Sequence, residues 1–313
     1  MPATTQTVVI LATGGTIAGR AATADDNVGY TAAQIGVEQL IAAVPGLVQR
    51  AGRLEAEQVS QLDSKDMDFA TWQKLARRVD ELLARPDVQG LVITHGTDTL
   101  EETAYFLQRV LAPAKPVVLT AAMRPATALL ADGPQNLLDA VSVARDCFAS
   151  GVLVAFGGSV LDATQVRKVH SYRVDAFAAA EGARLAVVEE GVVRWLLRAP
   201  QPEAALGLPR IARDAARWPR VQIVMNHVGA DGAVVNALRV QGVDGIVVAG
   251  TGNGTLSNAL EAALREAQAA GVRVLRSTRC DAGPVSALEG ALSSAGALSP
   301  VKARVELLLQ LLA

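Results

Sequence analysis

Two threonines, Thr16 and Thr97, each lie in a Gly-Thr turn directly after a short apolar run. Thr16 belongs to the stretch ILATGGTIAG, which begins at Ile10, and Thr97 belongs to VITHGTDTLEE, which begins at Val92. Each apolar run predicts a buried strand, and ligands of open α/β sheets bind beyond the carboxyl ends of the strands. We therefore expect both hydroxyl groups to face one crevice, where a threonine that is paired with a base can act as a nucleophile.

The residues after Thr16 predict a mobile loop. From Gly19 to Gly29 the chain is mostly small and polar, a composition typical of mobile surface loops. Tyr30 ends this loop, and its phenol can return to the hydroxyl of Thr16. A plainer interpretation stays open, in which Thr16 caps its turn and Tyr30 is only a loop aromatic.

A helix is predicted directly after Thr97 and Asp98. Their backbone N–H groups then lie at its positive end and can bind an anion or a developing oxyanion. Threonine and aspartate are also ordinary N-cap residues, so these residues alone do not decide between the two roles. Lys168, in the stretch QVRKVH, is on the same grounds one half of an Arg-Lys pair on a solvated hairpin.

Several segments of the chain resemble the bacterial-type L-asparaginases. The two threonine stretches are similar to the two signature segments of that family, and further similar segments follow in the same order over nearly the whole chain. These are KPVVLTAAMRP from Lys115, ADGPQNL from Ala131, Gly252-Asn253-Gly254 and Lys302-Ala303-Arg304. A single Gly-Gly-Thr is a weak signal, whereas several segments in order are a specific one.

The resemblance implies an amidohydrolase with two catalytic groups. Thr16 is expected to be the nucleophile with Tyr30 as its hydrogen-bonding partner, and Thr97, Lys168 and Asp98 are expected to form a second triad. The implied reaction is hydrolysis of the side-chain amide of L-asparagine to L-aspartate and ammonia through a β-aspartyl-enzyme intermediate, with a possible side activity on glutamine. The resemblance implies no metal and no other cofactor.

The resemblance also implies the substrate-binding residues, among them Thr97 and Asp98. Ser64 is expected to hold the α-carboxylate of the substrate. Lys65 stands where most relatives have a glutamine, so it either pairs with that carboxylate or points into solvent. Asn253 is expected to meet the substrate amine from a neighbouring subunit, and Glu289 is the candidate for the acid of that subunit. The family assembly implied is a homotetramer, a dimer of dimers.

Composition limits the other classes of function. The 313 residues carry a net charge of −2 with both signs interspersed, which does not predict a nucleic-acid-binding face. No apolar stretch reaches the ~18 residues that would predict a membrane span. The three histidines and two cysteines lack the spacing of metal ligands. The N-terminus lacks the basic and apolar segments of a signal peptide, which predicts a cytoplasmic protein.

Strand and helix patterns alternate along the first half of the chain and again near its end, which predicts an α/β protein. We expect a larger N-terminal domain (1–198) with a mostly parallel sheet flanked by helices plus β-hairpins. A linker (199–219) and a smaller C-terminal α/β domain (220–313) with a parallel sheet follow. The expected strands of the first sheet include Val8–Ala12, Gly90–Thr94 and Pro116–Thr120.

Three local expectations are more specific. Thr31 to Gln34 reads as a capping box that opens a helix running through Val44. Cys147 is expected to be a buried thiol within a helix Pro134–Phe148. Ser299-Pro300 predicts the N-cap and first residue of the last helix.

Other functions fit parts of the pattern. The Gly14–Gly19 turn after a first strand suggests a nucleotide-binding α/β protein, but its glycines do not match G-x-G-x-x-G. A non-catalytic asparagine sensor would keep the pocket without the reaction. The amide-releasing subunit of a tRNA amidotransferase would usually bring an additional N-terminal domain. His95 and His170 are expected to be structural, and the chain has no G-x-S-x-G motif of a serine hydrolase.

Overall fold

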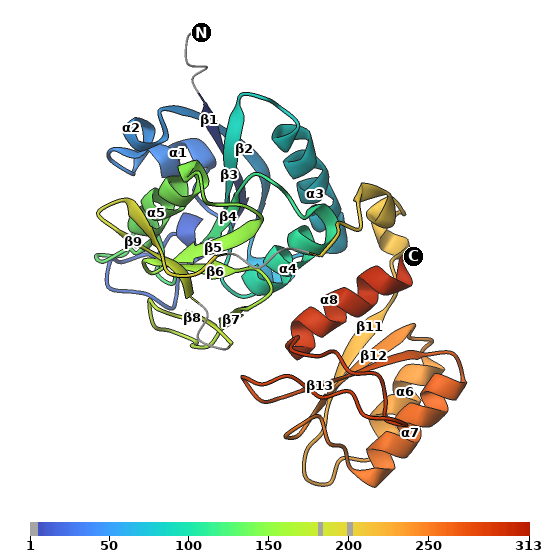
Figure 1. Cartoon of the computed structure of the whole chain (residues 1–313). Coiled ribbons are helices and arrows are strands. Elements are labelled where there is room, and N and C mark those ends of the chain that lie inside the picture. The colour runs from blue at the N-terminus through green and yellow to red at the C-terminus, as the bar shows by residue number, and fades with distance from the viewer. Residues whose placement is uncertain (1–5, 181–183, 199–202) are drawn as a thin grey trace. The chain divides into compact units, whose positions relative to one another are not determined.

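The computed structural model describes residues 6–180, 184–198 and 203–313. The chain divides into two compact units, Met1–Leu208 and Pro209–Ala313. In Figure 1 each unit consists of helices around a sheet.

The first unit is built on an eight-stranded sheet in the order β10-β9-β6-β5-β4-β3-β1-β2. Strands β2, β1, β3, β4 and β5 are parallel, and β6, β9 and β10 extend the sheet in antiparallel pairs. The strands are β1 (Thr7–Gly14), β2 (Arg53–Leu62), β3 (Val88–Thr94), β4 (Val117–Thr120), β5 (Val152–Phe156), β6 (Ser159–Asp162), β9 (Arg184–Glu189) and β10 (Val192–Trp195).

Helices cover both faces of this sheet. On one face, α5 packs across the central strands with α1 and α2 beside it, and alternate residues of β1 (Val8, Ile10 and Ala12) point into that layer. On the other face lie α3 and α4, which pack against each other and against β3 and β5. The helices are α1 (Val37–Ala42), α2 (Leu47–Ala51), α3 (Phe69–Leu83), α4 (Leu100–Leu111) and α5 (Gly133–Arg145). Burial on both faces explains why β1 and β3 read as continuous apolar runs.

A small two-stranded sheet, β7 (Val166–Lys168) with β8 (Phe177–Ala179), stands apart from the large one. Its antiparallel register pairs Lys168 with Phe177. The ring of Phe177 lies 4.9 Å from that of Phe156 at the end of β5, in an edge-to-face arrangement. The hairpin is therefore held to the unit by side chains as well as by its connections.

The second unit has a three-stranded parallel sheet in the order β11-β12-β13. Helix α8 covers one face, and α6 and α7 pack together on the other. The elements are β11 (Val221–Met225), α6 (Ala233–Val240), β12 (Gly245–Gly250), α7 (Asn258–Ala269), β13 (Arg273–Thr278) and α8 (Pro300–Leu311). The start of α8 is confirmed, since the Ser299 hydroxyl caps it and Pro300 is its first residue.

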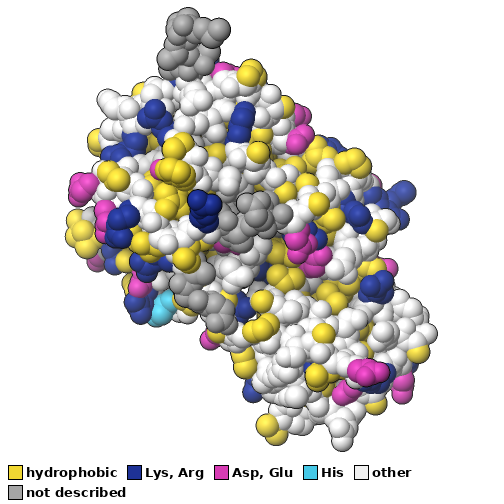
Figure 2. All heavy atoms as spheres, viewed as in Figure 1, with side chains coloured by type: hydrophobic (Ala, Val, Ile, Leu, Met, Phe, Trp, Pro, Cys, Tyr) yellow, Lys and Arg dark blue, Asp and Glu magenta, His cyan; other side chains and the backbone are white. Residues whose placement is uncertain are grey.

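The predicted fold class is confirmed in both parts of the chain: a large mostly parallel sheet with helices and hairpins, then a small parallel sheet. On the surface that Figure 2 presents, basic and acidic side chains are interspersed. No helix of the described residues is long and apolar enough to cross a membrane.

Two local expectations are wrong. Thr31 opens no helix: its backbone pairs with Arg20 in an antiparallel bridge, and α1 begins only at Val37. Cys147 is neither helical nor buried, because α5 ends at Arg145 and the thiol residue is exposed. The carboxylate of Asp146 accepts the backbone N–H of Phe148 at 2.9 Å, which favours a turn instead of a further helical turn.

Candidate active site

The candidate site lies where the parallel strands β1, β3 and β2 end. These strands are neighbours, and the register pairs Ala12 of β1 with Thr94 of β3. Each is followed directly by polar residues, and two of them lead into short 3₁₀ turns, Thr16–Ala18 after β1 and Ser64–Asp66 after β2. One edge of the sheet thus collects Thr16, Ser64 and Thr97.

Two glycines let the turns meet. Gly15 has a φ of 81°, and a Cβ there would lie 2.4 Å from the Cα of Gly96. A Cβ on Gly96 would lie 2.4 Å from the hydroxyl oxygen of Ser64. Because only glycine fits at both positions, the residues that follow, Thr16 and Thr97, start from backbones in direct contact.

The hydroxyl of Thr16 lies 2.6 Å from the phenol oxygen of Tyr30. Thr16 is buried and Tyr30 is half-buried. The bridge between Arg20 and Thr31, with backbone hydrogen bonds of 2.9 Å in both directions, closes the base of the intervening loop. Because Tyr30 directly precedes Thr31, this bridge brings its phenol back to Thr16. Backbone hydrogen bonds thus support the contact between the two side chains.

Lys168 joins the second group. Its ammonium donates to the hydroxyl of Thr97 at 2.8 Å and to the carboxylate of Asp98 at 2.6 Å. The Lys168 side chain is 19% exposed and that of Asp98 is 53% exposed. Lysine therefore bridges a buried hydroxyl and a solvated carboxylate, which is a hydrogen-bond chain that can move a proton at Thr97.

Ser64 is buried beneath this group. Its hydroxyl accepts the backbone N–H of Asp98 at 3.2 Å, and its carbonyl accepts the hydroxyl of Thr99 at 2.8 Å. The hydroxyl hydrogen of Ser64 remains available as a donor. The structure thus places Ser64 against the start of α4, beside both threonine turns.

Two family models match the chain. The model described as "Asparaginase, N-terminal" matches residues 7–201, and the one described as "Glutaminase/Asparaginase C-terminal domain" matches residues 220–313. The chain belongs to the asparaginase family. The resemblance seen in the sequence is confirmed.

Individual relatives match over most of this chain. An L-asparaginase 2 of Escherichia coli (strain K12) is 39% identical and covers 97% of this chain and 88% of its own. A glutaminase-asparaginase of Pseudomonas fluorescens biotype A is 42% identical over 88% of this chain and 76% of its own. A crystal structure of a probable cytoplasmic L-asparaginase from Campylobacter jejuni has a TM-score of 0.91 at 38% identity, covering 98% of this chain and 95% of that chain.

Lys65 contacts residues that lie next to it in the chain. Its ammonium lies 2.8 Å from the carboxylate of Asp66 and 3.1 Å from that of Asp63, and the side chain is 61% exposed. These two carboxylates, Asp66 first, raise the pKa of Lys65. Of the two expectations for Lys65, this placement favours the solvent-facing one.

His95 is fully buried, two residues before Thr97. Its Nδ1 lies 2.7 Å from the carbonyl oxygen of Gly96, which can only accept, so Nδ1 carries the proton. Its Nε2 lies 3.0 Å from the hydroxyl of Thr103, which in turn accepts the indole N–H of Trp72 at 2.8 Å. Burial lowers the pKa of His95 to about 4. His95 is thus a neutral histidine held by the fold, which agrees with its expected structural role.

Sequence reasoning missed the segment that supports the Tyr30 loop. Residues 126–129, between β4 and α5, make three hydrogen bonds of 2.9–3.0 Å to that loop. They are Ala126 N–H to Gly19 O, Ala21 N–H to the Thr127 hydroxyl, and Leu129 N–H to Ala24 O. The resemblance of the neighbouring Lys115–Pro125 stretch to the family was the available signal.

Asn253 and Glu289 lie in the second unit. Asn253 stands between Gly252 (φ 49°) and Gly254 (φ 74°) after β12, and its side-chain oxygen accepts the backbone N–H of Ser286 at 2.8 Å. Glu289 is exposed. Their roles depend on a neighbouring subunit and stay predictions.

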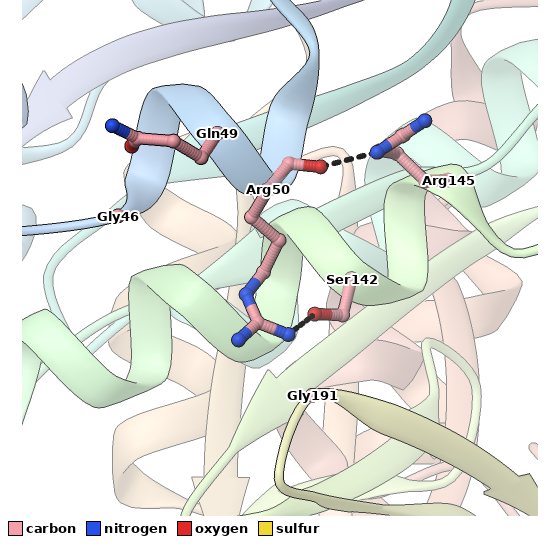
Figure 3. Close-up of a pocket in the computed structure, with 6 residues that line it drawn as sticks. All are labelled: Gly46, Gln49, Arg50, Ser142, Arg145 and Gly191. Atoms are coloured by element: carbon pink, nitrogen blue, oxygen red, sulfur yellow. Dashed lines mark hydrogen bonds between the residues drawn. The ribbon is translucent and has the colours of Figure 1, made fainter.

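A hollow of about 600 Å³ lies elsewhere on the first unit, beside α2, α5 and the turn at Gly191 (Figure 3). Its arginines are used within the fold: Arg50 donates to the hydroxyl of Ser142 at 3.2 Å, and Arg145 donates to the carbonyl of Arg50. None of the candidate catalytic residues lines it. Among the described residues no group of three or more His, Cys, Asp or Glu side chains is placed to hold a metal ion.

Proposed function

We propose that this chain hydrolyses the side-chain amide of L-asparagine to L-aspartate and ammonia, with Thr16 as the nucleophile. The observation that carries the proposal is the pair of bonded hydroxyls at one sheet edge, Thr16 with Tyr30 and Thr97 with Lys168. Membership of the asparaginase family and relatives named L-asparaginase support the substrate. Relatives named glutaminase-asparaginase support a side activity on glutamine.

In the first half of the reaction, Thr16 Oγ1 attacks the amide carbon while its proton passes through the Tyr30 hydroxyl, 2.6 Å away, toward the amide nitrogen. The C–N bond then breaks, and the nitrogen takes up a proton and leaves as ammonia. The backbone N–H of Asp98 is bonded to Ser64, so the N–H of Thr97 is our candidate for stabilising the oxyanion.

In the second half, water attacks the carbonyl carbon of the β-aspartyl ester on Thr16. The water loses a proton, the ester C–O bond breaks, and Thr16 regains its hydroxyl hydrogen. The hydrogen-bonded group of Thr97, Lys168 and Asp98 is suited to accept the proton of the water. No step requires a metal or an organic cofactor.

Substrate recognition in this proposal uses both units. Ser64 and Asp98 hold the α-carboxylate and α-amino groups from within one subunit, and Thr97 borders the same space. Asn253, together with Glu289, completes the site from a neighbouring subunit, in a homotetramer that is a dimer of dimers. Lys65, paired with Asp63 and Asp66, makes no direct contact with the substrate in this proposal.

The cellular location also stays a prediction, and we propose the cytoplasm. The solved structure from Campylobacter jejuni is titled a probable cytoplasmic L-asparaginase, whereas a relative from Haemophilus influenzae is named a probable periplasmic one. Fractionation of the native host would distinguish the two locations.

The proposed function is tested by ammonia release from asparagine and glutamine, measured side by side with Thr16→Ala as the control. Faster turnover of asparagine that is lost in Thr16→Ala supports the proposal. A folded wild-type protein that binds asparagine without releasing ammonia would indicate the sensor instead.

A further inference from the structure

The catalytic lysine stands on a strand that the large sheet does not hold. Lys168 ends β7, which pairs only with β8 among the described strands. The threonine and aspartate that it contacts belong to the turn between β3 and α4. The position of the ammonium at Thr97 therefore depends on what ties β7 to the start of α4.

Glu101 provides such a tie. It lies in the first turn of α4, three residues after Asp98 in the chain. Its Oε1 accepts the backbone N–H of Lys168 at 3.2 Å, while the side chain of Lys168 reaches Asp98 at 2.6 Å. One turn of chain thus holds Lys168 at two points, its backbone and its ammonium.

The second oxygen of Glu101 shows that this tie is costly. Oε2 is buried and has no hydrogen-bond partner among the described residues. A buried carboxylate oxygen without a hydrogen-bond donor opposes folding. The positive end of α4 compensates part of the charge, but an exposed or apolar residue would avoid the cost altogether.

We propose that Glu101 is a positioning residue. Its hydrogen bond to the backbone N–H of Lys168 sets the position of the Lys168 ammonium relative to the Thr97 hydroxyl. The inference rests on the proposed function, in which Lys168 acts on Thr97. The proposed role depends on the length of the side chain at position 101 and on its hydrogen-bond acceptor oxygen, and not on its charge.

Two substitutions separate these properties. Glu101→Gln keeps the chain length and one carbonyl oxygen but removes the charge, whereas Glu101→Asp keeps the charge and withdraws the acceptor by one methylene group. We expect Glu101→Gln to keep most of the kcat for asparagine. We expect Glu101→Asp to lower kcat by on the order of 10²-fold, the cost of a displacement of about 1 Å at a catalytic group, with KM within about twofold of wild type.

The kcat values of the two variants relative to each other decide whether the inference holds. A Glu101→Asp protein with wild-type kcat, or a Glu101→Gln protein that is the more impaired, would overturn the inference. So would a parallel rise of KM, which indicates general loosening of the site. Thermal melting of both proteins identifies a variant that is not folded, and Glu101→Ser then replaces Glu101→Asp with the same expected loss.

Lys168→Met in the same assay separates this inference from the proposed function. If Lys168→Met retains full turnover, the proposed role of the lysine is wrong. If Lys168→Met loses turnover but Glu101→Asp does not, only the positioning role of Glu101 is wrong.

Discussion

The ammonium of Lys168 lies 2.8 Å from the hydroxyl oxygen of Thr97, although the two residues are 71 positions apart in the chain. The contact joins a separate hairpin to the turn after β3. Thr97 lies before Thr99, the N-cap residue of α4, and its hydroxyl accepts a hydrogen bond from this hairpin. The catalytic proposal depends on this contact and on its counterpart at Thr16.

Removal of the Thr97 hydroxyl or of the Lys168 ammonium should slow turnover strongly. We expect Thr97→Ala and Lys168→Met each to lower kcat by about 10²–10⁴-fold, the usual contribution of a positioned acid or base. Thr97→Ser should retain part of the activity because it keeps the hydroxyl. Steady-state kinetics with a melting curve for each protein checks this, and wild-type kcat in Lys168→Met would contradict it.

The phenol of Tyr30 should matter to catalysis and not only to loop closure. Tyr30→Phe removes the oxygen 2.6 Å from Thr16 and keeps the ring, so we expect kcat to fall by at least about 10²-fold. Tyr172→Phe is the matched control, because Tyr172 is an exposed tyrosine of the same unit. Equal kcat values for the two variants would show that the Tyr30 hydroxyl has no role.

Lys65 should not bind the substrate. Its ammonium is engaged by Asp66 and Asp63 at the surface, so Lys65→Gln should leave KM for asparagine within about twofold of wild type. A direct contact with the α-carboxylate would instead raise KM at unchanged kcat, since that carboxylate does not react. A KM that rises tenfold or more at low salt would restore the first interpretation of this residue.

His95 predicts a pH dependence of stability. Its folded pKa of about 4 lies below the ordinary value of 6.5, so between these values the unfolded chain binds a proton that the folded protein does not. Stability therefore falls as the pH drops through this window, by about 2 kcal/mol from this residue at a pH of about 5.

Equilibrium urea unfolding at a pH of about 7 and of about 5, at one protein concentration, measures the effect. His95→Gln should show a smaller loss between the two conditions than wild type. His170→Gln, which changes an exposed histidine, should match wild type. An unchanged loss in His95→Gln would mean that the buried imidazole does not stay neutral.

Subunit mixing tests the proposed contribution of Asn253 from a neighbouring chain. Thr16→Ala and Asn253→Ala should each be nearly inactive alone. Hybrids formed by unfolding and refolding the two together should regain activity, because one site then combines an intact Thr16 with an intact Asn253 from the other subunit. If Asn253 serves its own chain, no hybrid site is complete and activity stays absent.

Much of the fold followed from the sequence for a physical reason. Strands β1 and β3 are buried on both faces, so they appear as apolar runs, and Gly-Thr turns mark their ends. Strand β2 was not predicted. It lies at the edge of the sheet, most of its residues are charged or polar, and Val59 is its only buried residue. Strand β8 has only three residues and a partner in a separate sheet, which leaves too short a pattern to detect.

Less of the site than of the fold could be predicted from the residues alone. The Gly-Thr turns indicated where Thr16 and Thr97 lie, but the link from Lys168 came from the family resemblance, because spacing along the chain says nothing about a contact between a hairpin and a distant turn. Glu101 was overlooked, since its position in a first helical turn is ordinary. The exposed Cys147 shows the opposite error, in which helical periodicity was extended past the true end of α5.

In the proposed reaction, Thr16 carries the acyl group. Rapid acid quenching of the enzyme during turnover of asparagine, followed by proteolysis and mass spectrometry, tests it directly. We expect one aspartyl group on the peptide that contains Thr16, absent in Thr16→Ala. An aspartyl group on the peptide that contains Thr97 would contradict it.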